Sequence, residues 1–234
     1  MKILAVGMNY ASHNKEMSET LLPKEPVIFS KPESSLIREG KPFFVPDFAD
    51  WFDYETELVV RISRLARNVS ERFAHRYYDE VTIGIDFTAR DLQEKLRKEG
   101  LPWDLCKGFD GAAGMGRFVK KSDLFKISGC TSVVPEMKES KTGSNIHVSD
   151  ASWRALMHDI HFHLDIDGKT VQTGHTADML FGVDQLVSYV SRFFTLKTGD
   201  LIFTGTPMGV GPVHEGQLLC GYLGDDQVLE LKVR

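Results

Sequence analysis

Cysteine is scarce in this chain of 234 residues. The three cysteines, Cys106, Cys130 and Cys220, are far apart and form no Cys-x-x-Cys pair. An odd number of widely spaced cysteines argues against a disulfide framework of the kind found in small secreted domains. We therefore expect reduced thiols and a cytoplasmic location.

Long apolar runs are missing as well. Residues 1–7 hold too short an apolar stretch for a signal peptide, and nothing approaches the roughly 20 apolar residues of a membrane-spanning helix. The sequence also lacks a cluster of lysine and arginine, and its formal net charge is −5. These features argue against nucleic acid and against a membrane as partners.

What is present is the composition of an ordinary folded protein. Hydrophobic residues make up 42% and charged residues 26% of the sequence, and the length suits one core, so we expect a single domain over residues 1–234. The apolar pattern and the turn formers predict strands over 3–6, 27–29, 53–62, 81–87, 162–166, 169–171 and 200–203. They predict helices over 9–17 with Ser12 as N-cap, 69–78, 89–99 before a C-cap at Gly100, and 186–194.

One segment, 127–158, departs from this pattern. Turn formers fill it without periodicity as far as Ala151, and so long a loop in a compact domain is either functional or mobile. We expect its first half to be mobile, because few large apolar side chains are present to offset the entropy lost on ordering. From Ala151 onward, Trp153, Leu156 and Met157 recur at the spacing of a short amphipathic helix.

The acidic strand over 53–62 carries the most informative motif. Side chains alternate between the two faces of a strand, so Glu55 and Glu57 project from one face with Asp53 beside them. Carboxylates this close repel one another unless a cation lies between them, and oxygen ligands favour Mg²⁺ or Mn²⁺, with Ca²⁺ possible. A solvated acidic edge strand is an equally good reading of this motif alone.

His13 and Glu16 form a second candidate group. On a helix, residues three apart lie on the same side, and a carboxylate that hydrogen-bonds an imidazole makes its other ring nitrogen a better base. The plainer interpretation is a polar helix face that carries the two residues by chance.

Further candidates lie between residues 86 and 211. Asp86 ends an apolar strand, where it is either a turn residue or a metal ligand. Arg90 and Gln93, one turn apart, either bind a ligand carboxylate or form a solvated face. Lys107 lies among aromatic residues and glycines. The glycine-rich loop over 205–211 lacks the Gly-Lys-Ser/Thr of a P-loop, and it is either an anion-binding loop or a tight turn.

These signals fall into stretches that follow one another along the chain. In order they are Gly7-Met8-Asn9-Tyr10 with His13 and Glu16, Pro26 to Pro32, Asp53 to Leu58, Asp86 to Gln93, Trp103 with Lys107, Gly199-Asp200, Thr204 to Pro207, and Gly209 to Gly211. Together they resemble the fumarylacetoacetate hydrolase superfamily, over nearly the whole chain except residues of about 128–158. Within it, the chain is most similar to the small acylpyruvases and oxaloacetate decarboxylases.

The resemblance implies a fold and a site. The fold is an α+β, β-rich mixed β-roll with flanking helices, usually a homodimer, in which 128–158 is an insertion-like segment. Glu55, Glu57 and Asp86 match the family's Mg²⁺ ligands, and Asp53 is left out of that set. His13 and Glu16 match a catalytic dyad on a lid, and the residues around a bound 2-oxo acid are matched by Lys107, Arg90, Gln93 and Thr206.

The expected activity follows from this resemblance. It is a Mg²⁺-dependent cleavage of the C–C bond of acylpyruvates, in which Lys107 and the metal stabilise an enolate, with decarboxylation of oxaloacetate as a second activity of the same site. One alternative is an isomerase of 2-hydroxyhepta-2,4-diene-1,7-dioate from aromatic catabolism. A metal-bound sensor or structural protein without catalysis is a further alternative, against which the His13–Glu16 pair argues.

Overall fold

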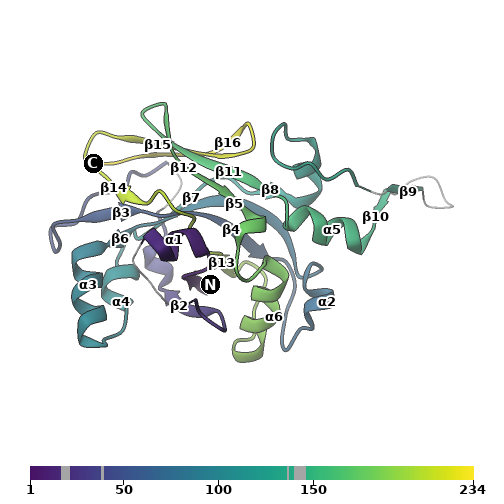
Figure 1. Ribbon diagram of the computed structural model, residues 1–234, viewed down its shortest axis with the longest axis horizontal. Coiled ribbons are helices and arrows are strands. Elements are labelled where there is room, and N and C mark those ends of the chain that lie inside the picture. Colours follow the sequence, from purple (N-terminus) through teal and green to yellow (C-terminus); the bar gives the residue numbers. More distant parts are fainter. Residues whose placement is uncertain (17–21, 38–39, 136, 140–145) are drawn as a thin grey trace.

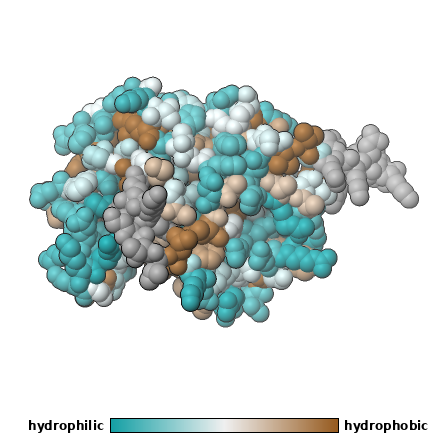
Figure 2. Space-filling view, viewed as in Figure 1, coloured by the Kyte–Doolittle hydropathy of each residue, from teal (hydrophilic) through white to brown (hydrophobic). Residues whose placement is uncertain are grey.

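The computed structural model describes residues 1–16, 22–37, 40–135, 137–139 and 146–234, with only the backbone at 14–16, 137–139 and 146–147. The chain is strand-rich with flanking helices, as expected from the sequence (Figure 1). Within the described residues, no helix is long and apolar enough to cross a membrane. The face shown in Figure 2 is mostly polar, with apolar side chains in small separate groups.

Two sheets make up most of the structure. The larger one runs in the order β2 (Val27–Lys31), β1 (Ile3–Gly7), β13 (Leu201–Phe203), β4 (Thr56–Ile62), β5 (Tyr78–Asp86) and β7 (Ala113–Met115), and β8 (Val119–Lys120) also pairs with β5. The second runs in the order β12 (Lys169–His175), β11 (His161–Ile166), β15 (Leu218–Leu223) and β16 (Asp226–Lys232). The larger sheet is mixed, because β1 and β13 pair in parallel, and the second sheet is antiparallel.

The remaining elements are shorter. A small sheet joins β14 (Gly211–Pro212), β3 (Phe52–Tyr54) and β6 (Thr88–Ala89), and another joins β10 (Ile146–Val148) and β9 (Met137–Glu139). The α-helices are α1 (Ala11–Glu16), α2 (Glu71–Ala74), α3 (Arg90–Glu99), α4 (Asp104–Lys107), α5 (Asp150–Met157) and α6 (Val183–Phe193). Three short 3₁₀ segments cover Glu33–Ser35, Lys121–Lys126 and Thr176–Asp178.

The centre of the large sheet is covered on both faces. Figure 1 shows the four-stranded sheet on one side and α3, α4 and α6 on the other. Accordingly, Leu58, Val59 and Val60 follow one another along β4 and are all fully buried, which explains why this strand is apolar on both faces rather than alternating. The polar residues near its beginning are therefore exceptions that require partners inside the protein.

Several predicted elements are confirmed. The strands predicted over 162–166 and 169–171 lie in β11 and β12, which form a hairpin that turns at Asp167 and Gly168. The helix α3 ends before Gly100, whose φ of 67° lies in the left-handed region that glycine adopts without strain. The helix predicted after Ala151 is α5, which begins after Ser149, whose side chain accepts a hydrogen bond from the amide of Ser152. Leu156 and Met157 are buried, as their spacing predicts.

Other boundaries were wrong. The helix predicted over 69–78 is only the four residues of α2, because Tyr78 pairs with Ile62 as the first residue of β5. The predicted N-cap Ser12 lies inside α1, which begins at Ala11. The acidic strand is divided at Glu55, with β3 and β4 in different sheets.

The segment 127–158 includes the unpredicted pair β9 and β10, at one end of the molecule (Figure 1). Residues 136 and 140–145 lie outside the described part of the chain. The expected mobility of the turn-rich half therefore stays a prediction.

Candidate active site

Three carboxylates meet where two neighbouring strands of the large sheet run side by side. β4 and β5 are antiparallel with Glu57 opposite Gly84, and the amide of Asp86 donates a 2.8 Å hydrogen bond to the carbonyl of Glu55. This register sets the end of β5 against the start of β4. One carboxylate oxygen from each of Glu55, Glu57 and Asp86 lies within 4.8 Å of the other two, and all three residues are buried.

Lys107, at the end of α4, places a positive charge among these carboxylates. Its Nζ donates to Glu55 Oε2 at 2.7 Å, to Asp86 Oδ2 at 3.0 Å and to Thr88 Oγ1 at 2.6 Å. Burial by itself lowers the pKa of Lys107, but the charges of Asp86 and Glu55 outweigh burial and raise it above its ordinary value. Lys107 is therefore a fixed cation.

Arg90 links the acidic segment to α3. Its Nε donates to Asp53 Oδ2 at 2.7 Å, its Nη2 to Glu55 Oε1 at 2.7 Å, and its Nη1 to Gln93 Oε1 at 2.6 Å. Burial raises the pKa of Glu55, yet Lys107 and Arg90 hold it well below its usual range. Glu55 is thus an ionised carboxylate, and Arg90 also orients the Gln93 amide.

Lys31, which was not among the predicted site residues, is a second buried lysine. Its Nζ lies 2.6 Å from Asp86 Oδ1 and donates to the carbonyls of Lys107 and Ala112. Burial lowers the pKa of Lys31, with the positive charge of Lys107 acting in the same direction. Asp86 therefore has a lysine on each of its two oxygens.

Among the described residues, the buried side chains of the site carry unequal numbers of opposite charges, and Arg97, which also lines the cavity, is exposed. Four carboxylates stand against three cations, namely Asp53, Glu55, Glu57 and Asp86 against Lys31, Arg90 and Lys107. Within the described part, Glu57 has no ion pair, and its Oε2 accepts a 2.7 Å hydrogen bond from the amide of Gly205. Burial raises the pKa of Glu57 well above its ordinary value, and the charges of Asp86 and Glu55 add to this.

This unbalanced cluster fits a bound divalent cation. The donor set consists of carboxylate oxygens, which hard ions such as Mg²⁺, Mn²⁺ and Ca²⁺ prefer. A cation beside Glu57 would offset the repulsion that disfavours its ionised form. Glu55, Glu57 and Asp86 are the residues that could hold it.

The loop after β13 closes one side of the site. Gly205 has a φ of 93°, and a Cβ there would lie 2.7 Å from the Cβ of Asn9, so glycine alone lets its amide reach Glu57. Asn9 fixes this loop by donating through Nδ2 to the carbonyl of Thr204 at 2.8 Å. The Thr206 hydroxyl donates to the carbonyl of Thr56 at 2.9 Å, so it is already used within the protein.

A cavity of about 70 Å³ opens onto the carboxylates. Its lining brings together eight of the predicted site residues, which are His13, Glu55, Glu57, Asp86, Arg90, Gln93, Lys107 and Thr206. The side chain of the ninth, Glu16, lies outside the described part, so the His13–Glu16 pairing stays a prediction.

The cavity wall contains residues that the sequence reasoning did not assign to the site. Phe29 and Trp103 pack edge to face with ring centroids 5.7 Å apart, and both line the cavity with Met8, whose φ of 61° is unusual for a residue other than glycine. Arg97 lines it as well. The position of Arg97 had a sequence signal, because it follows Arg90 by seven residues and so lies on the same face of α3.

Gln172 is another residue that sequence reasoning missed. It lies on β12, and its Nε2 donates to Thr206 Oγ1 and to the carbonyl of Pro207, both at 2.8 Å, while its Oε1 accepts from the amide of Thr56 at 3.0 Å. These bonds tie the loop to the start of β4. No local pattern marks Gln172, because its role depends on the packing of one sheet on the other.

Comparison with known proteins identifies the family. The family model described as Fumarylacetoacetate (FAA) hydrolase C-terminal matches residues 2–233. "Oxaloacetate tautomerase FAHD1, mitochondrial" of Bos taurus is 36% identical over 213 residues, which cover 91% of this chain and 82% of that protein.

Solved structures agree over the same length. Fumarylpyruvate hydrolase from Pseudomonas aeruginosa, in complex with Mn²⁺ and pyruvate, has a TM-score of 0.78 at 28% identity and covers 100% of this chain and 89% of its own. 2-Hydroxyhepta-2,4-diene-1,7-dioate isomerase from Mycobacterium marinum has a TM-score of 0.72 at 27% identity and covers 99% of this chain and 73% of its own. The chain belongs to the fumarylacetoacetate hydrolase family.

Proposed function

We propose that this protein is a divalent-metal-dependent enzyme that forms and stabilises the enolate of a small 2-oxo acid. The observation that carries the proposal is the buried group of Glu55, Glu57 and Asp86 with Lys107 among them, at the bottom of a small cavity. When bound, a divalent ion supplies Lewis-acid stabilisation of negative charge on an enolate oxygen. The P. aeruginosa fumarylpyruvate hydrolase, solved with Mn²⁺ and pyruvate, supports both the kind of metal and the kind of ligand.

The other side chains around the cavity stabilise charge, orient the substrate and exclude water. Lys107 supplies a fixed positive charge near the oxygen on which negative charge develops, because its three N–H groups already donate to Glu55, Asp86 and Thr88 and hold it in place before substrate arrives. Arg90 and Gln93 orient the substrate carboxylate from one face of α3. Phe29 and Trp103 keep water from the apolar side, which strengthens these charge interactions.

His13 is the residue that we assign to proton transfer. It is buried and lines the cavity, and Glu16, three residues later, is positioned by the sequence to orient it. With oxaloacetate, His13 takes a proton from C3 of the keto form and leaves the enolate, and protonation of the C2 oxygen then gives the enol; in the reverse direction the C2 hydroxyl loses its proton and His13 returns one to C3. With an acylpyruvate, His13 takes a proton from a water that attacks the distal carbonyl; the C2-side fragment then leaves as pyruvate enolate and is protonated at C3.

Oxaloacetate is the first candidate substrate. The bovine relative that matches 91% of this chain is named an oxaloacetate tautomerase, and Arg97 adds a second arginine on the cavity side of α3 that suits a second carboxylate. Hydrolysis of acylpyruvates, the first expectation from the sequence, is the second candidate, because a fumarylpyruvate hydrolase shares the fold over the whole chain. The isomerase alternative needs the same enolate and is supported by the M. marinum structure.

A substrate panel tests the proposal. The purified protein with Mn²⁺ or Mg²⁺ is assayed on enol-oxaloacetate, acetylpyruvate, fumarylpyruvate and 2-hydroxyhepta-2,4-diene-1,7-dioate, and decarboxylation of oxaloacetate is followed separately. We expect turnover of at least one of them, abolished by EDTA and by Glu57→Gln. Full turnover of the same substrate in EDTA would overturn the metal-dependent mechanism.

Assembly and location remain proposals. We propose a homodimer, to be tested by the mass measured in multi-angle light scattering. A cytoplasmic location, expected from the sequence, is a prediction for fractionation to test, since the name of the bovine relative includes the word mitochondrial.

A further inference from the structure

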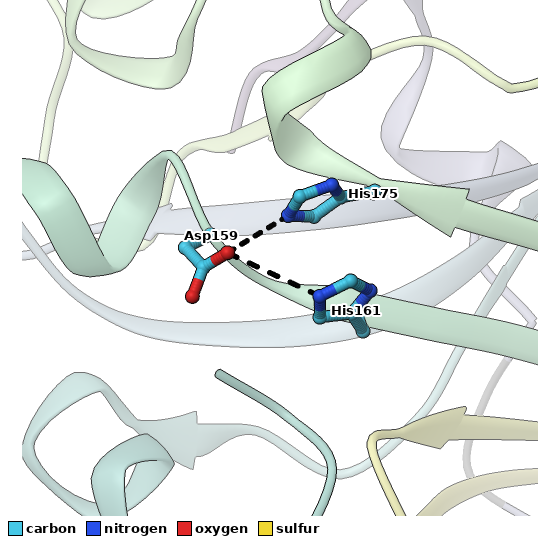
Figure 3. A group of neighbouring side chains, drawn as sticks. All are labelled: Asp159, His161 and His175. Carbon is cyan, nitrogen blue, oxygen red and sulfur yellow. Dashed lines mark hydrogen bonds and ion pairs between the residues drawn. The ribbon is translucent and has the colours of Figure 1, made fainter. Parts of the chain in front are cut away.

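Two histidines and an aspartate form a second polar group away from the cavity (Figure 3). Asp159 follows α5, His161 is the first residue of β11, and His175 is the last residue of β12. Antiparallel pairing sets His161 directly opposite His175. None of the three lines the active-site cavity, so the proposed reaction leaves this group unexplained.

Both imidazoles present Nε2 to the same carboxylate oxygen. Asp159 Oδ1 lies 3.0 Å from Nε2 of His175 and 4.0 Å from Nε2 of His161, and one ligand atom from each residue lies within 4.8 Å of the others. Tetrahedral zinc with bonds of about 2.0–2.1 Å places its ligand atoms roughly 3.3 Å apart. The two observed distances bracket this value.

The aspartate is held so that one oxygen is left for the histidines. Its Oδ2 accepts hydrogen bonds from Thr131 Oγ1 at 2.9 Å, from Ser132 Oγ at 2.7 Å and from the amide of Ser132 at 2.7 Å. Such outer partners fix the direction of a ligating carboxylate and are typical of metal sites. Thr131 and Ser132 belong to the insertion-like segment, which thereby gains a role in the described structure.

The histidine rings have to tilt toward each other to share an ion. They are stacked with centroids 3.9 Å apart and planes 8° apart, and a nitrogen lone pair lies in the plane of its ring, so the rings must tilt toward each other. The His161 side chain is 50% exposed and lines an open surface hollow with His163 and Thr173. It therefore has room to tilt, and water from the hollow can complete the coordination.

We propose that Asp159, His161 and His175 form a surface site for a borderline divalent metal ion, with Zn²⁺ as the first choice. Two imidazole nitrogens and one carboxylate suit zinc better than magnesium or calcium, which prefer oxygen ligands. A bound ion would join β11, β12 and, through Asp159, the segment at 131–132. Because the unfolded chain lacks this arrangement, zinc would raise the melting temperature.

The strand β11 offers a matched control. His163 lies on the same face as His161 and has its own aspartate, with Nε2 3.9 Å from Asp165 Oδ1. It differs in its ring partner, because His163 stacks on Tyr222 where His161 stacks on a histidine. His163→Ala therefore removes an exposed-face histidine of the same strand and leaves the proposed ligand set intact.

The test is a calorimetric titration in which Zn²⁺ is added to the protein in a buffer with millimolar Mg²⁺. The Mg²⁺ is there to occupy the site of Glu55, Glu57 and Asp86. We expect one high-affinity Zn²⁺ per chain, with affinity lowered more than tenfold in His161→Ala and in His175→Ala but unchanged in His163→Ala and in Glu57→Gln. Circular dichroism establishes that each variant is folded. Equal affinity in all variants, or loss of the site in Glu57→Gln alone, would overturn the proposal.

X-ray absorption of the zinc-loaded protein gives a second readout. We expect nitrogen and oxygen neighbours with the multiple scattering of two imidazoles at about 2.0–2.1 Å. Sulfur at about 2.3 Å would instead assign the ion to a cysteine, such as Cys130, whose carbonyl accepts a hydrogen bond from the amide of His161. That result would also overturn the proposal.

Discussion

The two groups of metal-ligating side chains in this protein differ in burial and in donor atoms. Glu55, Glu57 and Asp86 are buried at the junction of β4 and β5, and every ligand atom that they offer is a carboxylate oxygen. In the second group, Asp159 and His175 are partly exposed and His161 is half exposed, and nitrogen dominates. The first group is surrounded by lysines and an arginine, whereas hydroxyl and amide donors surround the second.

The difference shows how surroundings select an ion and its use. Buried carboxylates repel one another unless cations lie between them, so their site gathers the positive charges that can attract an anionic substrate. The surface site has one carboxylate rather than three, and a metal ion bound there gains chiefly by linking segments of chain. We therefore expect the buried group to serve catalysis and the surface group to serve stability.

Glu57→Gln tests the buried group by removing one of its three carboxylates, and we expect it to have the largest effect. The amide keeps the shape and can still accept the hydrogen bond from Gly205, but it removes one negative ligand, so Mn²⁺ affinity should fall by more than the roughly 10–100-fold seen when outer partners are lost. Activity should fall to the metal-free background. Isothermal titration with Mn²⁺ and the substrate panel measure both. The matched control is Glu80→Gln on β5, which removes a glutamate paired with Arg61 at the surface and should leave Mn²⁺ binding unchanged. Unchanged Mn²⁺ binding by Glu57→Gln would contradict the assignment of Glu57 as a metal ligand.

His13→Ala separates proton transfer from metal binding within the buried group. The loss of a positioned base should lower tautomerisation or hydrolysis by about 10²–10⁴-fold. Decarboxylation of oxaloacetate should fall less, because it needs neither water activation nor proton removal from C3. Mn²⁺ affinity is the control and should stay as in the wild type. A negligible loss in every assay would mean that His13 belongs to a polar helix face.

Arg97→Met tests whether Arg97 binds a second carboxylate of the substrate. A hydrogen bond to a charged group contributes about 1.5–3 kcal/mol, so KM for oxaloacetate or fumarylpyruvate should rise by roughly 10–100-fold. KM for acetylpyruvate, which has one carboxylate, should change little. Lys98→Met, the next position of the same helix, removes an exposed positive charge that does not line the cavity. Equal changes for both classes of substrate would show that Arg97 does not select dicarboxylates.

Much of the buried group could be predicted because its signals are local. The two-residue spacing of Glu55 and Glu57 survives even though the strand divides between them, since the Glu55 carbonyl still pairs with the amide of Asp86. Arg90 and Gln93 share a face of α3 as a helix requires. The α+β, β-rich fold followed from the same stretches through their resemblance to a family.

What the sequence could not give depends on contacts between distant segments. Lys31 and Gln172 gain their roles only when β2 and β12 are packed against the site. Lys31 lies within the matched stretch from Pro26 to Pro32, but nothing in that stretch singles out its side chain, and no pattern marks Gln172. The surface group is similar, because Asp159 and His161 are near in sequence but His175 joins them through the hairpin register. Periodicity likewise predicted a helix to Tyr78, where strand pairing prevailed.

A final comparison concerns two buried lysines, Lys107 inside the charged cluster and Lys121 outside it. Lys107 has carboxylates within 3.0 Å and a raised pKa, whereas Lys121 donates to the carbonyls of His75 and Tyr78, and burial lowers its pKa to about 8. The folded protein thus holds fewer protons at Lys121 than the unfolded chain between pH 8 and the ordinary lysine value. This residue's contribution to stability therefore rises with pH across that window, and the gain is lost as the pH falls from the ordinary lysine value to about 8. Relative to Lys121→Met, the free energy of unfolding of the wild type should increase by about 1 kcal/mol between pH 8.5 and 9.5. Urea unfolding at the two pH values measures this change in the free energy of unfolding. The control is Lys120→Met, a variant of the exposed neighbour, whose free energy of unfolding should change with pH as that of the wild type does. The same pH dependence in the wild type and in Lys121→Met would show that Lys121 titrates as an ordinary lysine.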